Sequence, residues 1–226
     1  MLAVMLKIGS VDYEETLKAA FPWAVEQIHR QETDHWAARI IRNLGDDAET
    51  VALGVFSRLQ QGTRDDLLVH CVNMYGQALV RKANDALSRK YGSCVRIGTL
   101  FMERDEGIFL QIRGIQVDYG SLPEQLLSCR RNPLVRMAAA AAGIGGAGAL
   151  EGPLLDYVRR EENRLRLIGE IQDLLNRFGL MIHLDDMDVA QEPDGSPLPF
   201  RHGADLSEGL KAALCDAAAG YLKELL

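Results

Sequence analysis

The tract from Met137 to Gly152 restricts the possible folds more than any other part of the chain. Its sequence, MAAAAAGIGGAGALEG, holds five consecutive alanines and five glycines, and the thirteen residues after Met137 carry no charge. Alanine is the best helix former and a poor strand former, so the alanine run predicts a helix. The small residues favour close packing of two backbones or a flexible connection between elements.

Three glycines in this tract, Gly143, Gly145 and Gly148, match the spacing G-x-G-x-x-G, and Gly146 lies among them. In dinucleotide-binding folds this spacing joins a strand to a helix, and backbone N–H groups contact the pyrophosphate. A helix is expected from Pro153, but alanines stand where the preceding strand should be. The alternative hypothesis is therefore an enzyme or sensor that binds a nucleotide or another phosphorylated ligand here. Arg136 and Arg159 would supply positive charge.

The chain has 226 residues, enough to bury a sizeable core, and we expect a single domain over residues 1–226. A subdivision near residue 92 or 120 is the alternative, although no linker-like segment supports it. The net charge of −7 argues against general nucleic-acid binding, which needs clustered Lys and Arg. The four cysteines form no C-x-x-C pair, so we interpret them as reduced thiols in a cytoplasmic protein.

No run of residues reaches the ~18 apolar positions that a membrane-spanning helix needs. The uncharged residues 137–150 leave a peripheral contact with a membrane as a second alternative, although alanine and glycine gain little on transfer to lipid.

Hydrophobic periodicity predicts an α+β fold that is mostly helical. The predicted helices are 12–30, 34–43, 47–60, 64–90, 121–128, 133–142, 153–178 and 206–226, and an opening strand is expected near 2–8. Two runs, 93–103 and 107–119, are rich in Val, Ile, Phe and Leu, with turn-forming residues between them. They predict an antiparallel hairpin with one buried face and a bulge at Gly114, where the apolar parity shifts. A strand near 180–189 completes a small antiparallel sheet.

The predicted strand near 180–189 carries four side chains that could bind a metal ion: His183, Asp185, Asp186 and Asp188. Strict alternation would place His183 and Asp185 with Met187 on one face and the other two aspartates on the opposite face. Because this divides the ligands, a charged strand edge that prevents aggregation is the favoured interpretation. Glu32 and His35 have the Glu-x-x-His spacing of di-iron bundles, but no second pair follows.

No nucleophile or zinc-protease motif occurs, and no cofactor is expected. The chain instead combines a hairpin, a long amphipathic helix and an unusual tract of small residues. These features suit packing against another chain. The sequence therefore favours a non-enzymatic interaction or assembly protein that has a protein partner or associates with itself.

Overall fold

The computed structural model describes residues 1–30, 43–92, 95–117, 155–156, 158–193, 195–199 and 206–225. The strands are β1 (Leu2–Val11), β2 (Val95–Arg96), β3 (Thr99–Arg104), β4 (Ile108–Val117) and β5 (Ile182–Gln191). The helices are α1 (Tyr13–Arg30), α3 (Ala48–Ser57), α4 (Gln61–Tyr91), α8 (Glu161–Arg177) and α9 (Glu208–Leu225), with a 3-10 turn at Gly45–Asp47. The predicted α+β class is confirmed.

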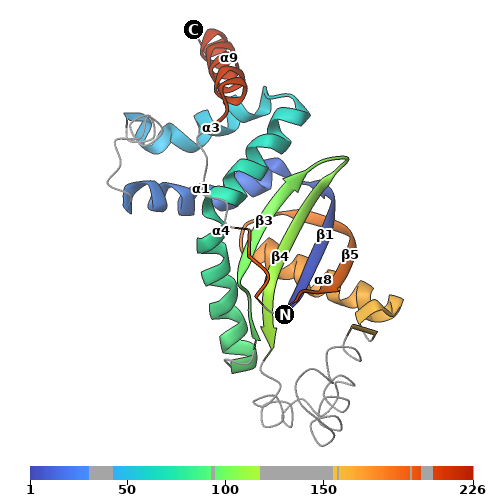
Figure 1. Ribbon diagram of the computed structural model, residues 1–226. Helices are drawn as coiled ribbons and strands as arrows, with labels where there is room; N and C mark the ends of the chain where they lie inside the picture. Colours follow the sequence, from blue (N-terminus) through green and yellow to red (C-terminus); the bar gives the residue numbers. More distant parts are fainter. Residues whose placement is uncertain are drawn as a thin grey trace, which may run out of the picture.

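All the described strands belong to one antiparallel sheet (Figure 1). β1 lies between β4 and β5, while β3 and β2 follow one another along the outer side of β4. The predicted hairpin is therefore present, but its first run is interrupted at Ile97 and Gly98. The predicted bulge at Gly114 is confirmed, because the pairing with β1 shifts at this point and Gly114 has a φ of +64°.

One face of the sheet carries the apolar core. Leu6, Met102 and Leu110 are the largest fully buried side chains, and they come from three different strands. Helices α4 and α8 add their apolar stripes to the same cluster, for example through Val72 and Ile168. This cluster joins the sheet to α4 and α8.

The predicted helix over residues 153–178 is wrong at one point, because the helical path breaks at Arg160. The Arg160 backbone is extended (φ −65°, ψ 131°), and α8 begins at the next residue. Glu161 and Glu162 then occupy its first turn, where negative charge is favourable next to the helix dipole. Helix periodicity alone does not reveal such a break, because the apolar stripe resumes beyond it.

Helix α4 covers the outer edge of β3 and β2. Its side-chain amides form hydrogen bonds with backbone groups at this edge, as a neighbouring strand would. The Asn73 amide donates to the Met102 carbonyl (2.9 Å) and accepts from the Met102 N–H (2.7 Å). Asn84, three helical turns further on, makes the same pair of bonds with Ile97 at 3.0 and 2.8 Å. Between them, a Cβ atom at Gly76 would lie 2.7 Å from the Leu100 carbonyl oxygen. Glycine therefore lets the helix backbone approach the strand closely.

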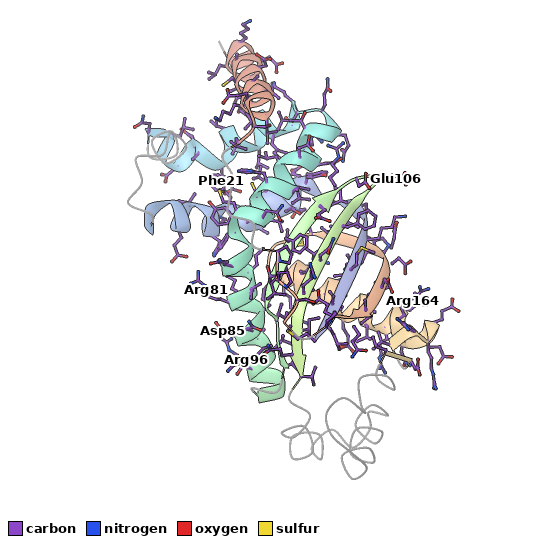
Figure 2. The ribbon with its side chains drawn as sticks, viewed as in Figure 1. Phe21, Arg81, Asp85, Arg96, Glu106 and Arg164 are labelled. Atoms are coloured by element: carbon purple, nitrogen blue, oxygen red, sulfur yellow. The ribbon has the colours of Figure 1, made fainter. Side chains whose placement is uncertain are left out.

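Helix α8 covers the opposite edge of the sheet in a similar way. Gln172 accepts from the Leu184 N–H (2.9 Å), and Asn176 accepts from the Ile182 N–H (3.1 Å). Figure 2 labels Arg81 and Asp85 on α4, which packs along β3, and Arg164 on α8, which packs along β5. Both outer strands thus have backbone groups satisfied by helix side chains, which disfavours the addition of a further strand.

Candidate functional site

The predicted glycine site lies outside the described residues. This applies to Gly143, Gly145, Gly146, Gly148 and Arg136, and also to Glu32 and His35. Arg159 is described, and its guanidinium donates to the Val189 carbonyl at the edge of β5 (3.3 Å). Binding of a phosphorylated ligand and contact with a membrane through residues 137–150 therefore stay predictions.

The four predicted metal-ligating residues on β5 share one exposed face, contrary to the expected division between two faces. The pairing of β5 with β1 shifts on both sides of Ile8, so strict alternation fails between Asp185 and Asp186. Met187 consequently points into the core and is only 4% exposed. The face assignment from strict alternation was therefore wrong.

The shared face does not gather these ligands around one point. Asp186 forms an ion pair with Arg164 (3.1 Å) and accepts from the Met187 N–H, while Asp188 accepts from the Val189 N–H. Within the described part of the chain, no three His, Cys, Asp or Glu side chains come together as a metal site. The position of β5 at the sheet edge and the exposure of its charges agree with an edge that disfavours aggregation.

A polar cluster that the sequence did not indicate joins α1, α4 and the β3–β4 hairpin. The Tyr13 hydroxyl donates to Asp65, which also accepts from Gln61 (3.0 Å). Arg104 donates to Asp66 (2.6 Å) and to the Gly62 carbonyl (2.7 Å). Each polar group faces a partner from the same molecule, so the cluster is suited to holding the hairpin against the start of α4.

The Tyr13 phenol gives a test of this cluster that depends on pH. Burial, followed by the hydrogen bond and the negative charge of Asp65, raises the pKa of Tyr13 far above its usual value. Because the folded-state pKa is the higher one, the contribution of Tyr13 to stability is complete below about pH 10 and is lost as the pH rises through the folded-state pKa.

We expect Asp65→Asn to lower the pKa of Tyr13, measured as tyrosinate absorbance in a pH titration. The difference between the wild-type and Tyr13→Phe titrations isolates this phenol from the other five tyrosines of the chain. The same difference, measured in the Asp65→Asn background, should move to lower pH. An unmoved titration would mean that Asp65 does not influence the phenol.

Helix α9 provides the best candidate for an interaction surface. It lies beside α3, away from the sheet, with the C-terminus at the opposite end of the molecule from the N-terminus (Figure 1). Leu210, Ala217 and Tyr221 are buried or half-buried along one side of α9. The Tyr221 ring occupies the space where Gly54 of α3 has no side chain, since a Cβ there would lie 2.2 Å from the ring.

A second side of α9 is apolar and exposed to solvent. We call it the α9 stripe, and it consists of Ala212, Cys215, Ala219 and Leu222. Their spacing of three, four and three residues places them along one line of the helix. Leu222 is 54% exposed, which makes it one of the few large apolar side chains that the described residues leave in water. A helix with apolar residues on two sides can pack against two neighbours at once.

Comparison with models of known protein families, with curated proteins and with solved structures gives no match to this chain. The described helices include none that is long and apolar enough to cross a membrane.

Proposed function

We propose that the protein is a non-enzymatic assembly protein that associates with a second copy of itself through the α9 stripe. The exposed apolar line of Ala212, Cys215, Ala219 and Leu222 supports this proposal. Three of these residues are small, so two such helices can approach closely, and Leu222 supplies apolar area at one end. One stripe serves both partners, as a two-fold interface requires.

The covered edges of the sheet also favour association through a helix. Asn73 and Asn84 occupy backbone groups of β3 and its neighbour Ile97, and Gln172 and Asn176 occupy those of β5. Strand addition at either edge would have to displace these side chains. Contacts between helices need no such rearrangement, because the α9 stripe is already exposed.

We expect Leu222→Lys to shift the association toward the monomer, because it places a charge within an apolar contact. Light scattering coupled to size-exclusion chromatography, run across a wide range of protein concentrations, measures the effect. Leu165→Lys is the matched control, since Leu165 on α8 is 57% exposed, close to the 54% of Leu222. A wild-type chain that stays monomeric at every concentration would contradict the proposal.

The cysteines of the chain give an independent measurement. Cys215 lies in the stripe and is exposed, so association should protect it from alkylation at high protein concentration. Burial raises the pKa of the Cys71 thiol to about 11, so it should react slowly at every concentration. Peptide mass spectrometry assigns each alkylated cysteine. Equal labelling of Cys215 at low and high concentration would count against a paired stripe.

A further inference from the structure

Two charged residues flank the α9 stripe on one side. Asp216 directly follows Cys215 of the stripe, Lys223 directly follows Leu222, and both charged residues are exposed. They are seven residues apart, so they lie two turns from each other at nearly the same angle around the helix. A second copy that covers the stripe therefore comes close to a negative charge near the middle of α9 and a positive charge near its C-terminus.

Antiparallel pairing of two α9 helices brings these opposite charges together. A two-fold axis at right angles to two antiparallel helices keeps the same flank of both helices on one side of the contact. With the middle of the stripe at the axis, Ala212 faces Leu222 of the partner subunit, and Asp216 lies beside Lys223 of the partner subunit. The symmetry repeats each contact, so one dimer contains two such ion pairs and has one leucine at each end of the stripe.

Parallel pairing brings like charges together instead. Glu208 lies four residues before Ala212, so it continues the line of the stripe, and its side chain is 91% exposed. In a parallel pair each residue on this line faces its own copy, so two Glu208 carboxylates would meet. Asp216 would lie beside Lys211 of the partner subunit rather than Lys223, and the two helix dipoles would point the same way.

We propose that the partner copy lies antiparallel to α9, and that reciprocal ion pairs between Asp216 and Lys223 select this orientation. This inference rests on the proposed self-association and specifies how the partner is placed. Exposed ion pairs add little affinity, so their effect is to choose between orientations that bury the same apolar residues.

Charge reversal on this flank tests the orientation. Asp216→Lys places two lysines at each pair, and Lys223→Asp places two aspartates there. We expect each variant to raise the dissociation constant of the dimer about tenfold, because every dimer contains the altered pair twice. An equimolar mixture of the two variants has opposite charges at both pairs of a mixed dimer, so it should regain the affinity of the wild type. Analytical ultracentrifugation measures these dissociation constants.

Two controls on the same helix separate the orientations. Lys211→Asp is the matched control for Lys223→Asp, because Lys211 lies on the opposite flank and meets Asp216 only in a parallel pair. It should leave the antiparallel dimer nearly unchanged. Glu208→Gln removes a repulsion that only the parallel pair contains, so it should not strengthen the antiparallel dimer.

Cysteine cross-linking reports the orientation without a change of charge. In the antiparallel pair Cys215 faces Ala219 of the partner subunit. Wild type is mixed with a chain that carries Cys215→Ala and Ala219→Cys, and the mixture is oxidised with copper phenanthroline. We expect mass spectrometry of the peptides to find position 215 of one chain linked to position 219 of the other. A parallel pair would link Cys215 to Cys215.

The outcomes separate the two proposals. Unchanged dissociation constants in Asp216→Lys and Lys223→Asp, or links between two Cys215 residues, would overturn the antiparallel arrangement while leaving self-association intact. A wild-type chain that is monomeric at all concentrations would overturn self-association and the orientation with it. Weaker dimers in both variants, restored by mixing them, would support both.

Discussion

Asn73→Leu should lower the free energy of unfolding by about 2–4 kcal/mol, because the Met102 N–H and C=O then lose their partners at a partly buried site. Leucine has nearly the shape of asparagine, so loss of side-chain packing contributes little. The free energy comes from urea denaturation followed by circular dichroism.

Two variants test the interpretation of the Asn73 result. Gln77→Leu replaces an exposed amide on the same helix and should change the stability by less than about 0.5 kcal/mol. Asn73→Asp keeps an acceptor for the Met102 N–H but has no donor for the Met102 carbonyl, so its loss should be intermediate. If Asn73→Leu is as stable as Gln77→Leu, the amide does not act as a substitute for a neighbouring strand.

The Asn73 bonds explain why strand addition is an unsuitable way for this sheet to assemble. A covered edge offers few free N–H and C=O groups, and the charges of β5 disfavour close approach on the other side. The self-association that we propose would then use a helix, and exposed apolar residues form a line on α9. The edges therefore support the α9 stripe as the interaction surface.

The sequence predicted the elements that have a strong hydrophobic period. The hairpin followed from alternating apolar residues, and the bulge at Gly114 followed from the change in apolar parity there. Gly114 has a positive φ, which a residue with a side chain would disfavour. The break at Arg160 and the interruption at Ile97 and Gly98 were missed. Both depend on where neighbouring elements must meet, which a local pattern does not contain.

The candidate surface was harder to predict from the sequence than the fold. A final helix was expected, but Leu210 and Leu222 are both leucines, and composition does not tell which one is buried. The hydrogen bonds of Asn73 with the backbone of β3 were also not predicted, since Asn73 lies among the apolar residues of a long amphipathic helix. A clue was available in the pair Asn73 and Gly76, because both are poor helix formers inside an otherwise favourable helix.

Glu192→Ala should also lower the free energy of unfolding by about 2–4 kcal/mol. Glu192 is 7% exposed, forms an ion pair with Arg113 and accepts from the buried Gly114 N–H at 3.0 Å. Its own backbone pairs with Met1, since the Glu192 N–H donates to the Met1 carbonyl at 2.8 Å. Removal of the carboxylate leaves a partly buried guanidinium and a buried N–H without their partner, which costs more than the ion pair itself contributes.

Comparison with three further variants shows whether the unpaired groups cause the Glu192→Ala loss. Glu106→Ala removes an exposed carboxylate at the tip of the hairpin (Figure 2) and should have almost no effect. Glu192→Gln keeps one oxygen as an acceptor and should lose less than Glu192→Ala. The double variant Arg113→Met with Glu192→Leu removes both charges together, so it should be more stable than Glu192→Ala. If the double variant is the less stable one, the pair stabilises the fold by mutual attraction rather than by avoiding an unpaired charge.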